Sequence, residues 1–227
     1  MKWGIIAAME AELALILAAM EVEREETAYG TTFYDGRING RPVAAVCCGI
    51  GTINAAASAS VLIRELGVTA LVNIGVAGST GGELGLLDVV LSSEVVFHDA
   101  DITFMKDYYP YRESYPADSG LIALAEKSIA GMGGRAFNYA VGRVATGDVF
   151  VNDPARKRDI INRLSPLCVE MEGAAIGQIA YMSGRPFLVI RSLSDDSGEG
   201  AQLSFESFLE EAAKNAAGIV LRMIETQ

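Results

Sequence analysis

The feature that most constrains this chain is a regular alternation of short apolar runs with longer runs of helical length. The apolar runs have the length and flanking turn residues of strands, and the runs between them are long enough for helices. The predicted strands are 2–8, 31–38, 42–48, 70–75, 88–96, 140–144, 168–171 and 187–192. The predicted helices start near Glu10 and cover 52–66, 121–132, 154–164, an Ala-rich run ending near 183, and 204–225. This alternation predicts an α/β fold: a single three-layer domain, 1–227, with a central mixed sheet flanked by helices.

Some local signals sharpen this prediction. Asn39-Gly40 joins two of the strands, and this dipeptide is the strongest short signal of a β-hairpin. Asp153 before Pro154 predicts a capped helix start. Residues 102–118 contain four tyrosines and two prolines and follow neither period, so an irregular loop is predicted there. Shorter loops are predicted at 76–85, 147–152 and 194–202.

Composition excludes several classes of partner. The 227 residues carry 18 basic and 29 acidic side chains, a net charge of −11, which repels nucleic acid and anionic lipid. No run of 18 uninterrupted apolar residues is present, so no membrane span is predicted. The three cysteines, two of them adjacent, make a poor disulfide framework. Buried free thiols in a reducing, cytoplasmic compartment are therefore predicted.

Acidic residues are abundant after the predicted strands, which is where ligands of open α/β sheets bind. A single histidine and scattered cysteines give no zinc spacing, and neither a P-loop nor a G-x-G-x-x-G motif is present. A Ser-His-Asp triad would have to use His98, but the sequence has no nucleophile elbow to supply its serine. We therefore expect no metal and no cofactor, and chemistry based on carboxylates.

Eight segments carry a resemblance to a known family: GIIAAMEAE, CGIGTINAA, NIGVAG, HDADIT, GDVFV, VEMEGAA, RSLSDD and LSFESFL. In order and spacing, over nearly the whole chain, they resemble the 5′-methylthioadenosine/S-adenosylhomocysteine nucleosidases of the nucleoside phosphorylase superfamily. The resemblance implies a nucleoside phosphorylase-like fold, a homodimer, and a place in methionine salvage. It also implies hydrolysis of the N-glycosidic bond of 5′-substituted adenine nucleosides, with methylthioadenosine, S-adenosylhomocysteine and 5′-deoxyadenosine as candidate substrates.

The resemblance also implies roles for individual residues. Glu12 matches the carboxylate that activates water, Glu172 the one that holds the ribose hydroxyls, and Asp195 the acid at adenine N7. Further residues match the substrate-binding positions, with Met171 below the ribose, Phe150 and Val151 at the adenine, Arg191 and Ser194 supporting the site, and Met9, Ile50 and Phe205 around the 5′ substituent.

Elementary chemistry agrees with these roles, because N-riboside cleavage passes through an oxocarbenium-like sugar. Such a reaction needs negative charge near the ribose, a base for water and an acid at the leaving purine. Each acid alone has a simpler explanation. Glu12 suits the helix dipole, and either Asp195 or its neighbour Asp196 can be a solvated turn residue.

The chain departs from the family pattern at two places. Val76 stands where many relatives carry a serine near the water. The segment 104–115 carries charged residues among aromatics, whereas relatives usually have a Gly- and Pro-containing segment that covers the partner subunit's pocket. The 5′ substituent therefore stays open, with a futalosine-type nucleoside as one alternative.

Two rival functions can be weighed against hydrolysis. A phosphorolytic purine nucleoside phosphorylase would need cationic or Gly-rich groups where this chain has Met9, Glu10 and Glu12, so water is favoured over phosphate. A non-catalytic nucleoside-binding module would not require three acids at one site.

Overall fold

The computed structural model describes residues 1–198 and 201–227. The strands are β1 (Trp3–Ala7), β2 (Glu21–Ala28), β3 (Thr31–Ile38), β4 (Arg41–Cys47), β5 (Ala70–Ser79), β6 (Val89–Phe97), β7 (Tyr115–Pro116), β8 (Tyr139–Thr146), β9 (Cys168–Glu170) and β10 (Phe187–Asp195). The helices are α1 (Glu10–Ala19), α2 (Thr52–Arg64), α3 (Ile102–Asp107), α4 (Ser119–Ala130), α5 (Pro154–Leu164), α6 (Gly173–Met182) and α7 (Ala201–Thr226).

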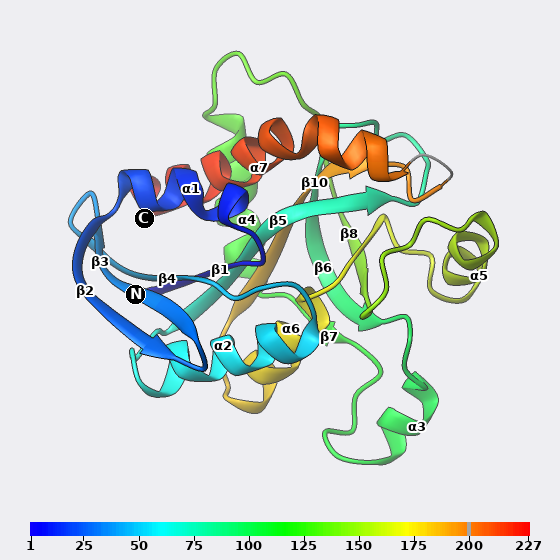
Figure 1. Ribbon diagram of the computed structural model, residues 1–227, viewed down its shortest axis with the longest axis horizontal. Coiled ribbons are helices and arrows are strands. Elements are labelled where there is room, and N and C mark those ends of the chain that lie inside the picture. The colour runs from blue at the N-terminus through cyan, green and yellow to red at the C-terminus, as the bar shows by residue number, and fades with distance from the viewer. Residues whose placement is uncertain (199–200) are drawn as a thin grey trace.

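Helices cover both faces of the central sheet, as the alternation predicted (Figure 1). On one face, α1, α4 and α7 pack against the sheet, and on the other α2 and α6 do so. Strand β1 explains why both faces must be covered, because Trp3 and Ile5 belong to the first apolar core and Ile6 to the second. A strand with apolar side chains on both faces is stable only between two layers of helices. The predicted three-layer fold with a mixed sheet is confirmed.

The sheet also closes on part of itself. Its order is β10-β6-β8-β9-β5-β1-β4-β3-β2, and β10 additionally pairs with β5. Strands β1, β4, β5 and β10 run parallel to one another, as do β6, β8 and β9. The two groups meet antiparallel at β10–β6 and β5–β9. The sheet is therefore not an open sheet with one carboxyl edge: β6 begins beside the last part of β10, and β9 pairs antiparallel with the last residues of β5.

One strand was missed in the sequence. Strand β2 has the sequence EVEREETA and is mostly exposed at the edge of the sheet. Charged side chains are typical of edge strands because they discourage pairing with another molecule, but they hide the apolar signal. The turn into β3 uses Tyr29 with φ 53° and Gly30 with φ 77°, a pair less diagnostic than Asn39-Gly40, whose hairpin is confirmed.

Two central strands run further than predicted. Strand β5 continues beyond the predicted end at Gly75 through Gly78 to Ser79, and β10 continues beyond Ser192 through Ser194 to Asp195. Glycines and polar residues in these stretches resembled loops in the sequence. Each of these strands is buried over its whole length, so the additional residues bring polar groups into the interior.

The segment 102–118 is more ordered than predicted. Helix α3 begins there after Asp101, whose carboxylate accepts hydrogen bonds from the Thr103 and Phe104 N–H groups at 3.1 Å. Strand β7 then pairs with β6. Helix α7 begins by Ala201, earlier than the predicted 204, and the predicted loop 194–202 includes residues 199–200, which lie outside the described residues.

The cap of α5 is confirmed, with Asp153 accepting from the Ala155 and Arg156 N–H groups and Pro154 at the first helical position. All three cysteines are free; Cys48 and Cys168 are buried as predicted, whereas Cys47 is only half-buried. None of the helices in the described part of the chain is long and apolar enough to cross a membrane.

Candidate active site

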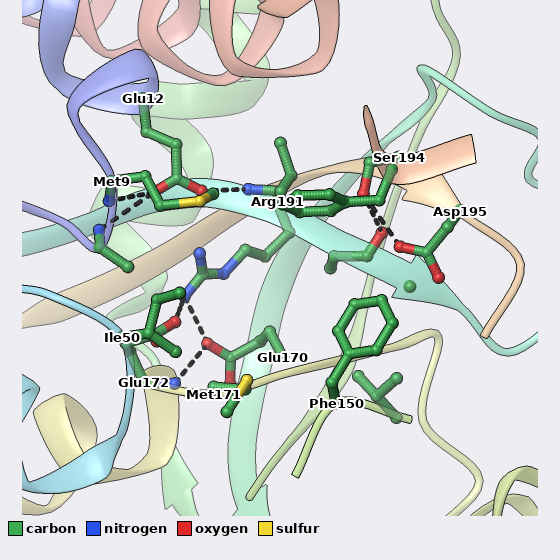
Figure 2. A pocket seen from close by; sticks show the side chains of 16 residues that line it. Met9, Glu12, Ile50, Phe150, Glu170, Met171, Glu172, Arg191, Ser194 and Asp195 are labelled. Atoms are coloured by element: carbon green, nitrogen blue, oxygen red, sulfur yellow. Dashed lines mark hydrogen bonds and ion pairs between the residues drawn. The ribbon is translucent and has the colours of Figure 1, made fainter. Parts of the chain in front are cut away.

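A cavity lies where the two groups of strands converge, and all predicted site residues except Val151 line it (Figure 2). Val151 lines an adjoining hollow that shares Phe150, Met171 and Asp195 with the cavity. The lining residues are Ala8, Met9, Glu12, Ile50, Val76, Ala77, Gly78, Phe150, Val169, Glu170, Met171, Glu172, Arg191, Ser194, Asp195 and Phe205. Two ends can be distinguished: the arginine end, with Glu12, Glu170, Glu172 and Arg191, and the aspartate end, with Ser194, Asp195 and Ser197.

Glu12 is held by backbone groups from two elements. It is 2% exposed, and its Oε2 accepts from the N–H groups of Ala8 at 3.0 Å and Met9 at 2.9 Å. Its Oε1 accepts from the Val76 N–H at 2.9 Å. The last bond uses backbone, so Val76 orients Glu12 without needing a side-chain hydroxyl. Burial raises the pKa of Glu12 above its usual value, against the opposing effects of Arg191 and these three donors.

The Arg191 side chain lies against a glycine of the neighbouring strand. It lies opposite Gly75 in the β10–β5 pairing, and a methyl group at Gly75 would overlap the guanidinium and lie 2.5 Å from Glu12 Oε1. The glycine in NIGVAG therefore makes room for an arginine and a glutamate to meet inside the protein. Burial alone would lower the pKa of Arg191, but the three surrounding glutamates raise it above its ordinary value.

Glu172 lies at the start of α6 and connects three elements. Its Oε1 accepts from the Gly51 N–H at 2.9 Å, and its Oε2 lies 3.2 Å from Arg191 Nη2. Burial, with the nearby carboxylates of Glu170 and Glu12, raises the pKa of Glu172 to about 7 against the opposing effects of Arg191 and the Gly51 N–H. Glu172 is therefore poised to titrate near neutral pH.

Asp195 dominates the aspartate end of the cavity. It is 2% exposed, accepts from the Ser197 N–H at 2.8 Å, and accepts from the Ser194 hydroxyl at 3.0 Å. Burial raises the pKa of Asp195, which these two hydrogen bonds oppose. Gly78 lies opposite Asp195, and a methyl group there would lie 2.8 Å from Asp195 Oδ1, so a second glycine allows this close approach.

Apolar side chains form the remaining walls. Phe150 and Phe205 meet edge to face with ring centroids 6.0 Å apart, and Phe150 is 37% exposed. Ile50 is 54% exposed beside Glu172, and Met9 lies close to Glu12 (Figure 2). The cavity therefore combines buried carboxylates with an accessible apolar rim, which suits a small ligand with one flat face.

The two adjacent aspartates differ in position. Asp195 lines the cavity, whereas Asp196 is exposed and its backbone carbonyl accepts a hydrogen bond from Lys157. His98 directly follows β6 and is buried, but it does not line the cavity.

Sequence reasoning left three polar residues of this site without a role. Glu170 pairs with Arg191, Thr146 donates to Glu170, and Asn73 Oδ1 accepts from Arg191 Nη2 at 2.6 Å. Each stands in or directly after an apolar run, where a polar side chain is costly to bury without a partner. That signal was available in the sequence for Glu170, which was noted after its strand but was not assigned a function.

Among residues 1–198 and 201–227, no group of three or more His, Cys, Asp or Glu side chains is arranged to hold a metal ion.

Comparisons with known proteins agree with this geometry. A model of the phosphorylase superfamily matches residues 2–225. A 5′-methylthioadenosine/S-adenosylhomocysteine nucleosidase from Geobacillus thermodenitrificans is 40% identical over 231 residues, covering 99% of this chain and 96% of that protein. The structure of such a nucleosidase from Colwellia psychrerythraea in complex with adenine has a TM-score of 0.93 and 35% identity, covering 99% and 95% of the two chains. The Neisseria meningitidis nucleosidase in complex with methylthio-immucillin-A has a TM-score of 0.93 and 31% identity, covering 100% and 99%.

Proposed function

The chain belongs to the phosphorylase superfamily and, within it, to the 5′-methylthioadenosine/S-adenosylhomocysteine nucleosidases, and from this premise we propose how its cavity performs the reaction. The reaction is hydrolysis of the N-glycosidic bond of an adenine nucleoside, which releases adenine and a 5′-substituted ribose. The observation that carries the mechanism is that four buried carboxylates line one cavity, with Glu12, Glu170 and Glu172 at the arginine end and Asp195 at the aspartate end; the reaction uses Glu12, Glu172 and Asp195.

Glu12 activates the attacking water. It is fixed by three backbone donors, so its carboxylate keeps one orientation as water approaches the anomeric carbon. Its raised pKa makes it a stronger base than an exposed glutamate, while Arg191 favours its ionised form. The proton removed from water moves to a Glu12 oxygen as the new C–O bond forms.

Asp195 protonates the leaving purine at N7. Burial raises its pKa, and the ion pairs in the described part of the chain leave it without a cationic partner, so it retains a proton more readily than an exposed aspartate. The Ser194 hydroxyl contacts one carboxyl oxygen and sets its orientation. Proton transfer lets the electrons of the C–N bond leave with a neutral base.

Glu172 accepts hydrogen bonds from the ribose hydroxyls and stabilises the positive charge that develops on the sugar. Its two oxygens are oriented by the Gly51 N–H and Arg191, and Met171 packs beside it. Phe150 stacks on the adenine at the accessible rim, with Val151 behind it.

The balance of charge favours water over phosphate as the nucleophile. Arg191 is the one cationic side chain among the described residues of the lining, and Glu170 and Glu172 already bind it. A phosphate at Glu12 would meet uncompensated negative charge.

The 5′ substituent contacts Met9, Ile50 and Phe205, an apolar group of walls that accepts a thioether more readily than a charged group. The test is adenine release from nucleosides that differ only at the 5′ position: methylthioadenosine, S-adenosylhomocysteine, 5′-deoxyadenosine, adenosine and, for a different base, futalosine. We expect the thioethers to be cleaved with the highest kcat/KM. Preference for futalosine would identify the alternative function, and no cleavage of any nucleoside would overturn the proposal.

The working unit in this proposal is a homodimer of single domains, 1–227, acting in the cytoplasm in methionine salvage. Three free thiols suit a reducing compartment. The exposed aromatic residues Phe104, Tyr108, Tyr109 and Tyr111 suit a subunit contact. A monomer by light scattering at micromolar concentration would contradict the dimer.

A further inference from the structure

Glu170 is a buried carboxylate at the arginine end that the proposed mechanism does not use. It is 6% exposed, and it receives four hydrogen bonds from three directions. Its Oε2 accepts from the N–H groups of Glu172 at 3.0 Å and Gly173 at 2.8 Å and from the Arg191 guanidinium. Its Oε1 accepts from the Thr146 hydroxyl. These four bonds fix the position and orientation of the Glu170 carboxylate.

The partners of Glu170 are themselves site residues. Arg191 Nη2 bonds to Glu170 and approaches Glu172 Oε2 at 3.2 Å (Figure 2). It also donates to Asn73 Oδ1 at 2.6 Å. Because Glu170 is its closer carboxylate partner, Arg191 is largely neutralised before it reaches Glu172. Without Glu170, the same guanidinium would keep Glu172 as its one ion-pair partner among the described residues.

Glu170 also fixes the backbone that carries Glu172. Its bonds to two successive N–H groups bind the first residues of α6 to the end of β9. The Thr146 hydroxyl links the same carboxylate to β8 while accepting from the Ala174 N–H at 2.8 Å. The direction in which Glu172 enters the cavity is thus set by Glu170 and not by contacts of Glu172 alone.

We propose that Glu170 is a positioning residue of the nucleosidase site: it holds Arg191 and the 171–173 turn so that Glu172 and Glu12 face the ribose without a free cation to neutralise them. This inference rests on the proposed function of Glu172 and Glu12. In this role Glu170 controls the charge at the arginine end and does not itself contact the substrate.

The proposal has a consequence for pH dependence. Glu172 is faced by Glu12 from α1, Cys48 from the end of β4, Glu170 from β9 and Arg191 from β10. Glu170 is in turn faced by Arg191, Glu172, Cys168 and His98. Removing the charge of Glu170 takes away a negative charge near Glu172. It also leaves the positive charge of Arg191 to act more strongly on Glu172. Both changes lower the pKa of Glu172.

The experiment is the pH profile of kcat/KM for methylthioadenosine in the parent protein and in Glu170→Gln. We expect the acidic limb of the profile to move to lower pH by roughly one unit, together with a loss of kcat. Glu170→Asp, which keeps the charge, should leave the limb at its parental position. If Glu170→Gln does not fold, Thr146→Val removes one donor to Glu170 and should move the limb in the same direction by less.

Glu94→Gln is the matched control. Glu94 is also a glutamate on a strand of this sheet, and it binds Arg143 at 2.9 and 2.7 Å, but it does not line the cavity. Its substitution should change stability without moving the acidic limb. An acidic limb that is unchanged in Glu170→Gln and Thr146→Val would overturn the inference while the parent remains active. A parent that releases no adenine at any pH would instead overturn the proposed function.

Discussion

The two ends of the cavity place the same chemical group in opposite electrostatic settings. At the arginine end, Glu12 and Glu172 are buried beside a guanidinium, and backbone N–H groups bind both of them. At the aspartate end, Asp195 is equally buried, but its partners are a hydroxyl and one N–H group. Burial raises all three pKa values. The charge of Arg191 is the main opposing effect on the first two carboxylates, whereas at Asp195 the main opposing effects are its two hydrogen bonds, and the charge of Lys157 contributes less.

This difference teaches how one cavity can hold a base and an acid together. A carboxylate with a neighbouring cation keeps its negative charge and can accept a proton from water. A carboxylate without one holds its proton and can donate it to a purine. The assignment of roles therefore depends on Arg191, whose place in the fold depends in turn on Gly75.

The largest expected effect comes from removing the acid. Asp195→Asn keeps the size of the side chain and one of its two acceptor oxygens but cannot donate a carboxyl proton. We expect kcat for methylthioadenosine to fall by ~10²–10⁴-fold, the usual worth of general acid catalysis. Steady-state kinetics measure the loss. Asp196→Asn is the control, because that neighbour is exposed, and it should retain nearly parental kcat. Equal losses in the two variants would break the assignment.

The next effect concerns Gly75 and Gly78, the glycines that leave space for the side chains at the two ends of the cavity. A methyl group in Gly75→Ala would meet Arg191 and Glu12, which are locked in buried pairs, so we expect a loss of ~1–3 kcal/mol in the free energy of unfolding. In Gly78→Ala the methyl group would meet Ser197, which follows β10 and can shift, so the loss should be smaller. Urea unfolding measures both.

Gly133→Ala is the control for the glycine pair, because a methyl group at Gly133 has nothing within 4 Å. Its stability should be close to that of the parent. A Gly75→Ala variant as stable as Gly133→Ala would show that the arginine end is looser than its contacts indicate.

A smaller effect links charge to stability at the arginine end. Because the pKa of Glu172 rises from 4.5 to about 7 on folding, its protonated form favours the folded state. This contribution is fully present below pH 4.5 and is lost as the pH rises through about 7. Glutamine is neutral at every pH, so Glu172→Gln keeps this stabilising contribution. We therefore expect the Tm of the variant to exceed that of the parent by roughly 2–4 °C at alkaline pH.

The sign of this effect is checked by thermal melts at two pH values. The advantage of Glu172→Gln should shrink at acidic pH, where the parent carries a protonated Glu172. An advantage that is independent of pH would indicate a change in packing and not in charge.

Much of this molecule could be predicted from its sequence because the informative signals are local. Apolar runs and the Asn39-Gly40 turn located the central strands and one hairpin. The predicted site residues also meet in space, with Val151 in the adjoining hollow. Most of them follow β1, β4, β8 and β9 or lie in the last residues of β5 and β10.

The rest depended on pairing between distant segments, which no local pattern reveals. The closure of the sheet through β10 and β5 brings opposed strands to one cavity, and the charged strand β2 lacks an apolar signal. Gly78 was predicted in a loop, and nothing local shows why glycine stands at 75 or 78, because Arg191 and Asp195, which need the space, lie on β10 more than a hundred positions later. The role of Glu170 likewise follows only from its contacts with Arg191 and Thr146.

The most direct test of the contrast between the two ends uses a leaving group that needs no proton. In a p-nitrophenyl 5-methylthioriboside, the departing phenolate is stable as an anion, so an acid is unnecessary, whereas attack by water still needs a base. We predict that Asp195→Asn loses kcat/KM on methylthioadenosine by ~10²-fold or more but retains most of it on the aryl riboside, while Glu12→Gln loses it on both. Equal losses on both substrates in Asp195→Asn would contradict the account.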